Sequence, residues 1–346
     1  MDLALFWFIL IAILWTGYLV LEGFDFGVAM LMEKVGKGDR GRRVALNTIG
    51  PVWDGNEVWL LTAGGAMFAA FPEWYATLFS GFYLPLLLIL LALIVRAVAI
   101  EYRGKINDDT WRRRWDWMIM GSAWIPSILW GVAFANIVRG VPIDETGTYT
   151  GGFFNLLNPY ALLGGATTLA LFLSHGAIFL ALKTDGDVRE RAEALSRRLA
   201  PVALVVAAAF AIWTQIAYSV AWTWAAVAVA AVGLVVAMGA GRIGRYGVAF
   251  VANGVAIAFA VVLIFGSLYP DVMPSTTDPA YSLTIENASS TDYTLTVMTW
   301  VAVVLTPVVL LYQGWTYWVF RRRLSSDNIP EHSSLTFLPK KSKAKQ

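Results

Sequence analysis

Two carboxylates stand at the start of residues 51–71, a stretch that carries no other charge. Asp54 and Glu57 are three residues apart and are flanked by Trp53 and Trp59. Carboxylates at the start of an apolar helix cost free energy in a membrane, so we expect them to have a structural or functional role. Two interpretations are open at this point: the pair caps the start of a helix, or it carries protons.

A second acidic pair, Glu22 and Asp25, lies deep inside the apolar stretch 3–32. The two residues are three apart and therefore share one face of a helix. They are too far from a helix end to act as caps. Arg96, inside the apolar stretch 75–100, is the predicted ion-pair partner if these carboxylates are structural; otherwise we expect a polar site built from the first three spans.

These residues sit in a strongly apolar chain. Of 346 residues, 58% are hydrophobic and only 14% are charged, against about 25% charged in soluble domains. A span needs about 20 residues, and the sequence predicts an all-α polytopic membrane protein with about nine. We expect them at 3–32, 53–71, 75–100, 116–138, 158–182, 199–220, 222–240, 246–269 and 293–320.

The basic residues predict the orientation of these spans. Of the 26 Lys and Arg, all except Arg96 and Arg139 fall in alternate connections and in the C-terminal tail, on one side of the membrane. The positive-inside rule then predicts an N-terminus outside and a C-terminus in the cytoplasm. The N-terminal run follows Asp2 and is too long for a cleaved signal peptide, so we expect it to remain as the first span.

We expect a single transmembrane domain over 1–324, followed by a basic cytoplasmic tail over 325–346 that is mobile because it contains few apolar residues. Asp116, next to an arginine run, is interpreted as a solvated or capping residue. His175 is the one histidine inside a predicted span and the chain has no cysteine. We therefore expect His175 to be a hydrogen-bonded helix-packing residue rather than a haem or metal ligand, and expect no conventional redox centre in this chain alone.

Several motifs, in order along the chain, resemble subunit II of bacterial cytochrome bd quinol oxidase. They span the chain from the first predicted helix to the last, and they are specific as a set. They are Leu21–Leu31 (LEGFDFGVAML), Trp53–Phe68 (WDGNEVWLLTAGGAMF), Phe79–Tyr83 (FSGFY), Gly131–Phe134 (GVAF), Phe153–Pro159 (FFNLLNP), Val272–Ser275 (VMPS) and Val297–Trp300 (VMTW).

This resemblance implies two four-helix bundles plus one peripheral helix, in the bacterial plasma membrane. It also implies a complex that oxidises menaquinol or ubiquinol and reduces dioxygen to water, building a proton gradient without pumping. Haems b and d are expected in the partner, subunit I, and small single-helix accessory subunits and membrane lipid complete the expected partners. No nucleic-acid partner is expected.

The resemblance also assigns roles to residues. Asp54 is implicated in a cytoplasmic proton pathway, which Glu22 and Asp25 would extend and to which Glu57 would contribute. It further places a structural quinone against Trp53 and an oxygen route near Trp59. These roles are implied by the family and not by spacing or composition, except that of Glu57, which is a candidate through its position three residues after Asp54.

Two other functions compete with proton delivery. The first is an ion-coupled secondary transporter, in which carboxylates near the membrane midplane couple ion and substrate movement. Such a protein should carry polar sites in both halves, whereas the predicted spans from 158 onward contain no Asp, Glu, Lys or Arg except at their ends. The second is a purely structural assembly subunit without a proton role, which only substitution of Asp54 or Glu22 would distinguish.

Overall fold

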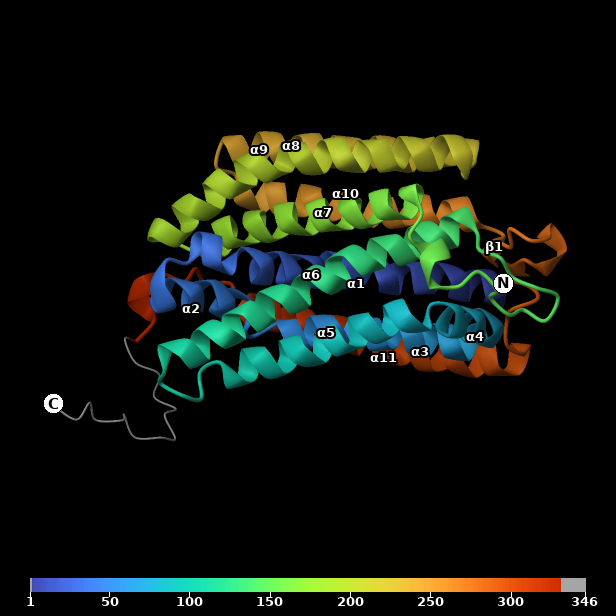
Figure 1. Ribbon diagram of the computed structural model, residues 1–346, viewed down its shortest axis with the longest axis horizontal. Helices are drawn as coiled ribbons and strands as arrows, with labels where there is room; N and C mark the ends of the chain where they lie inside the picture. The colour runs from blue at the N-terminus through green and yellow to red at the C-terminus, as the bar shows by residue number, and fades with distance from the viewer. Residues whose placement is uncertain (1, 331–346) are drawn as a thin grey trace.

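The computed structural model describes residues 2–330; the part of the expected tail over 331–346 lies outside them. The chain is built from long helices that run side by side, with their connections gathered at two ends (Figure 1). The α helices are α1 (Leu3–Val35), α2 (Gly38–Ile49), α3 (Trp53–Ala70), α4 (Pro72–Gly81), α5 (Tyr83–Tyr102), α6 (Asp109–Arg139), α7 (Pro159–Lys183), α8 (Gly186–Ala217), α9 (Trp224–Arg242), α10 (Tyr246–Leu268) and α11 (Asp292–Val319).

Short 3-10 turns and one small antiparallel pair of strands complete the structure. The turns are η1 (Phe153–Leu156), η2 (Ala221–Thr223), η3 (Pro279–Tyr281) and η4 (Ser326–Asn328), and the strands are β1 (Asp271–Met273) and β2 (Leu283–Thr284). The strands pair with Asp271 opposite Thr284. They lie in the long connection between α10 and α11.

Eight helices in the described part are long and apolar enough to cross a membrane: α1, α5, α6, α7, α8, α9 together with η2, α10 and α11. The predicted second span appears as α3, which has 18 residues and carries Asp54 and Glu57 near its start. The all-α polytopic fold class is confirmed. The protein contains a first group of α1, α3, α5 and α6, a second group of α7 to α10, and α11 against α1 and α3.

The predicted span 75–100 is wrong in one respect, because the structure divides it into α4 and α5. Phe82 leaves the helical conformation between them. Pro85 lies in the first turn of α5, where a backbone N–H would have no partner within the helix. Its missing N–H therefore costs little free energy at this position, and a new helix can begin here. Other differences are polar helical segments that a hydropathy pattern does not detect: α2, the start of α6 from Asp109 and the start of α8 from Gly186.

The chain connections alternate between the two ends, as the basic pattern predicts. At one end, which we call the basic end, Arg191 donates to the Val35 carbonyl at 2.5 Å and the Leu324 N–H donates to the Lys183 carbonyl at 2.8 Å. At the other end, the Ser290 N–H donates to the Ala70 carbonyl at 2.8 Å. That the basic end faces the cytoplasm stays a prediction of the positive-inside rule.

The two helix groups meet along α7, which packs against both α6 and α1, and the crossing of α1 with α7 depends on glycine. A Cβ placed on Gly176 would lie 2.5 Å from the Cα of Gly27, and one placed on Gly27 would lie 2.8 Å from the Cα of Gly176. The two backbones therefore touch, which is how small residues drive helix association in membranes. α1 is central as a result, with Phe24, Phe26 and Val28 fully buried around the crossing.

We predict that Gly176→Ala separates α1 from α7 and lowers stability by about 1–3 kcal/mol, the usual cost of overpacking. Gly239→Ala is the matched control, because Gly239 is helical and has nothing within 4 Å of its added Cβ. The control should be neutral or slightly stabilising, since Ala favours helix. Thermal unfolding of the purified protein measures both, and equal melting temperatures for the two variants would refute the close crossing.

Candidate functional site

One arginine and two acids from three helices meet inside the first helix group. Arg96 of α5 forms ion pairs with Glu22 of α1 and with Glu57 of α3, the second at 3.3 Å between Nη2 and Oε2. The Arg96 side chain is 1% exposed, Glu22 is fully buried and Glu57 is 20% exposed. The structure therefore assembles these three residues, which lie 35 and 39 positions apart in the sequence, into one charged cluster.

Aromatic rings cover the remaining faces of this guanidinium. The Arg96 Cζ lies 4.6 Å from the ring centroid of Phe26 and 6.0 Å from that of Trp53. Both rings offer a π-face to the cation. Trp53 is itself buried, so its ring packs between the start of α3 and the Arg96 guanidinium.

Asp25 lies beside this cluster but is held by a different partner. Its Oδ2 accepts a hydrogen bond of 2.7 Å from the side-chain amide of Asn56. Its Oδ1, like Oε2 of Glu22, is buried and accepts no hydrogen bond within the described residues. Buried polar atoms are normally hydrogen-bonded, so these two oxygens are exceptions that keep free acceptor capacity.

The peripheral helix α11 reaches the site through two polar side chains that the sequence analysis did not assign to it. The Asn56 Oδ1 accepts from the Tyr317 hydroxyl at 2.8 Å and from Gln313 Nε2 at 3.1 Å. Gln313 in turn accepts from the Trp59 indole at 2.7 Å. The only available signal was that Gln313 is the one amide inside an otherwise apolar or hydroxylic span.

Asp54 stands apart from this buried group. It is exposed at the start of α3, and no ion pair or side-chain hydrogen bond to it occurs among the described residues. Val52, not Asp54, occupies the N-cap position of α3, and no side chain caps that helix. The capping interpretation of Asp54 and Glu57 is therefore not what the structure shows: Asp54 is unpaired and Glu57 is turned to Arg96.

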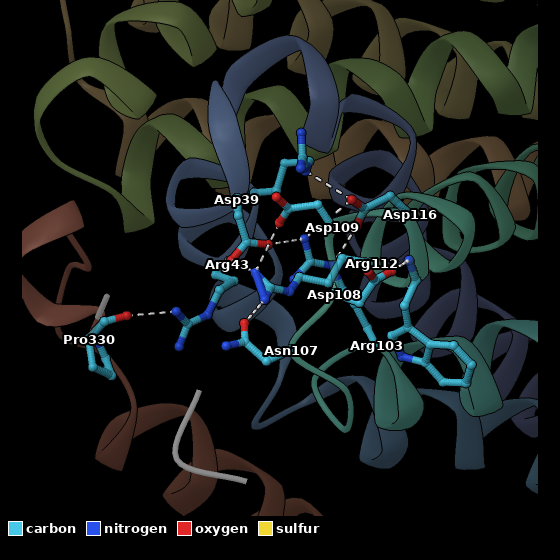
Figure 2. A network of polar contacts seen from close by, with 11 residues as sticks. Asp39, Arg43, Arg103, Asn107, Asp108, Asp109, Arg112, Asp116 and Pro330 are labelled. Atoms are coloured by element: carbon cyan, nitrogen blue, oxygen red, sulfur yellow. Dashed lines mark hydrogen bonds and ion pairs between the residues drawn. The ribbon is translucent and has the colours of Figure 1, made fainter. Parts of the chain in front are cut away.

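A separate polar network joins helices at the basic end (Figure 2). Asp116 accepts from Arg103 Nε at 2.5 Å and pairs with Arg42 at 2.9 Å, and Arg103 also reaches Asp39 at 2.8 Å. Asp116 is fully buried, so its interpretation as a solvated or capping residue is wrong; Asp108 is the side chain that caps α6. Burial lowers the pKa of Arg103, but the hydrogen bond and charge of Asp116 outweigh it and hold that pKa above its usual value.

His175 packs in the second helix group, away from the acidic cluster. Its ring is parallel to that of Phe250, with centroids 4.5 Å apart and an interplanar angle of 4°, and meets the Phe24 ring edge-on at 5.9 Å. Phe250 therefore covers one face of the imidazole. Within residues 2–330, no three His, Cys, Asp or Glu side chains group closely enough to hold a metal ion.

We predict that Arg96→Gln destabilises the protein by about 3–5 kcal/mol, because it leaves two acids without their buried partner. Adding Glu22→Gln should recover part of the loss by removing one uncompensated charge. Arg242→Gln, an exposed arginine, is the control and should change stability by less than about 0.5 kcal/mol. The free energy of unfolding in mixed detergent micelles measures all three, and a double variant no better than Arg96→Gln would contradict the ion pair.

Comparison with known proteins agrees with this arrangement. Residues 3–320 match the family model for cytochrome bd terminal oxidase subunit II. The chain is 42% identical over 324 residues to cytochrome bd ubiquinol oxidase subunit 2 of Bacillus subtilis (strain 168), covering 92% of this chain and 96% of that one. It is 37% identical over 365 residues to cytochrome bd-I ubiquinol oxidase subunit 2 of Escherichia coli (strain K12), covering 94% and 96%.

The fold also matches a solved structure, that of the bd oxidase from Geobacillus thermodenitrificans. The TM-score is 0.76 at 18% sequence identity, over 92% of this chain and 97% of that chain. At that identity the likeness concerns the fold, while the family follows from the sequence matches above. The chain belongs to the cytochrome bd terminal oxidase subunit II family and is thus a bacterial membrane protein that forms part of a quinol oxidase, an oxidoreductase complex of the respiratory chain.

Proposed function

We propose that this subunit scaffolds a haem-bearing partner and delivers protons to it from the cytoplasm, in a complex that oxidises quinol and reduces dioxygen to water. The observation that carries the proposal is the buried acidic cluster of Glu22, Asp25 and Glu57 around one arginine, Arg96. Ionisable groups inside a membrane are costly and mark ion or proton routes.

The charges of this cluster favour proton storage. Two carboxyl groups pair with a single guanidinium and a third, that of Asp25, lies nearby, so full ionisation would leave two uncompensated negative charges in a medium of low dielectric constant. We infer that the cluster shares at least one proton. The unpartnered oxygens of Glu22 and Asp25 are the atoms at which such a proton would be held or passed on.

An entry point lies at the basic end, where protons would arrive from the cytoplasm. Asp54 is exposed and unpaired there, so it is free to exchange protons with water. Glu57 is one helical turn further into α3, on the same face, and contacts Arg96. Because α1 runs towards the basic end, Asp25 lies one helical turn nearer to that end than Glu22. The proposed order from the surface to the interior is therefore Asp54, then Glu57 and Asp25, then Glu22.

Haems b and d are proposed to lie in the partner, subunit I, with quinol and dioxygen reacting there and with single-helix accessory subunits as further partners. The full burial of His175 among side chains such as Phe24 and Phe250 supports this assignment, because an axial haem ligand needs open space for the porphyrin beside its ring nitrogen. When bound, haems supply the electron transfer and oxygen chemistry; the residues of this chain would hold and move protons.

Trp53 and Trp59 have different surroundings, which bears on their proposed roles. Trp53 packs over Arg96, where a structural quinone head would meet the charged cluster. Trp59 lines an apolar groove of about 490 Å³ between α1, α3 and α11, which suits an apolar molecule such as dioxygen. A secondary transporter is disfavoured, because among the described residues the buried Asp, Glu, Lys and Arg side chains all lie between α1 and α6, and none lies in α7 to α11.

We predict that Asp54→Asn lowers oxygen consumption of the assembled complex tenfold or more, since proton transfer by a positioned acid contributes roughly 10²–10⁴-fold. Haem content and melting temperature should stay unchanged, because Asp54 has no side-chain partner within residues 2–330. Asp109→Asn is the matched control: its side chain is 96% exposed at the start of α6 on the same side, and it should leave turnover unchanged.

Unchanged turnover and proton uptake in a fully assembled Asp54→Asn complex would overturn the entry role. If Glu22→Gln also left turnover intact, the subunit would be a scaffold only. Loss of haem from either variant would indicate an assembly defect, and spectra of the purified complex distinguish that outcome from a slow proton step.

A further inference from the structure

Two adjoining cavities open at the basic end, between α2, α7, α10 and the end of α11. Their volumes are about 560 Å³ and 360 Å³. Thr48, Lys183 and Phe320 line both, so the two form one continuous hollow. None of its lining residues is Arg96 or one of the acids near it, although Tyr317, which donates to Asn56, lies in its wall.

The deep wall of this hollow is apolar. Val52, Phe179 and Phe250 line its smaller part, and the two phenylalanines belong to the spanning helices α7 and α10. The hollow therefore runs from the end of the helix group towards the membrane interior. Such a surface suits a hydrocarbon chain.

Its mouth is cationic. Lys183, Arg321, Arg322 and Arg323 line the hollow. The carboxylate of Asp185 lies 3.5 Å from Arg323 Nη1, but it also pairs with Arg189 at 3.2 Å. Four cations and one shared carboxylate leave a clear positive excess at the mouth.

The positions of these cations are fixed by the chain that follows α11. Leu324 pairs with the segment after α7: its N–H donates to the Lys183 carbonyl at 2.8 Å and its carbonyl accepts from the Asp185 N–H at 2.9 Å. The Lys183 ammonium donates to the carbonyls of Phe320 and Arg322. Further on, Arg43 donates to the Pro330 carbonyl at 2.7 Å, which ties the segment to α2 (Figure 2).

We propose that this hollow binds an anionic phospholipid of the inner leaflet, with the phosphate among Lys183 and Arg321–Arg323 and an acyl chain along Phe179 and Phe250. Charge complementarity selects the headgroup, since basic pockets between helices on the cytoplasmic side bind anionic lipid heads. The apolar wall selects a lipid over a free anion. The proposal is independent of the proton route.

The test measures lipid binding to the whole delipidated complex by native mass spectrometry, with phosphatidylglycerol and phosphatidylcholine titrated separately. Phosphatidylglycerol should bind at least tenfold more tightly. The double variant Arg322→Gln/Arg323→Gln should weaken it about thirtyfold, taking about 1 kcal/mol for each cation and tenfold for each 1.4 kcal/mol.

The matched control is Arg242→Gln/Arg245→Gln, which removes two exposed arginines at the same end between α9 and α10. It should leave the affinity within about twofold. Equal affinity for the two lipids, or an equal loss in both double variants, would overturn the proposal. Displacement of the lipid by millimolar inorganic phosphate would also overturn it, because the site would then recognise a small anion and not a lipid.

Discussion

The ion pairs of Arg96 are the interaction on which the first helix group depends. A lone guanidinium or carboxylate in the membrane interior would be expelled or neutralised, so Arg96 and its acids can be buried only together. Because Arg96, Glu22 and Glu57 come from α5, α1 and α3, satisfying one charge fixes three helices relative to one another. Because Arg96 can be buried only with acidic partners, its ion pairs also hold acidic side chains together at the place where we propose the proton route.

Two further constraints surround this cluster. The glycine crossing of α1 and α7 leaves no room for α1 to slide, so the depth of Glu22 and Asp25 is set by backbone contact. At the same level, α11 is attached to the site by Gln313 and Tyr317 bonding to Asn56. Helix α11 is otherwise almost uncovered, with Leu295 as its one buried residue, so polar contacts rather than packing hold it here.

The sequence predicted the parts of this arrangement that follow from local pattern. The length of the apolar stretches identified the spanning helices, and the three-residue spacing of Glu22 and Asp25 placed both on one helix face. Of the long-range pairs, only that of Arg96 with Glu22 was open to prediction, because Arg96 is the one cation inside a predicted span. Nothing near Asp116 indicates that Arg42 and Arg103 converge on it, and Tyr317 looks like any interfacial tyrosine. The division of 75–100 into α4 and α5 was readable from Pro85, but the strong hydrophobicity of that stretch obscured it.

The central claim, that the buried carboxyls take up and release protons during turnover, is tested most directly by infrared difference spectroscopy of the intact complex as oxygen is reduced. A protonated carboxyl group absorbs infrared light at a different frequency from an ionised carboxylate. The account therefore predicts a carboxyl band that changes during turnover. That band should disappear in Glu22→Gln or Asp25→Asn and persist in Asp109→Asn. A turnover spectrum with no carboxyl band assignable to Glu22, Asp25 or Glu57 would contradict the account.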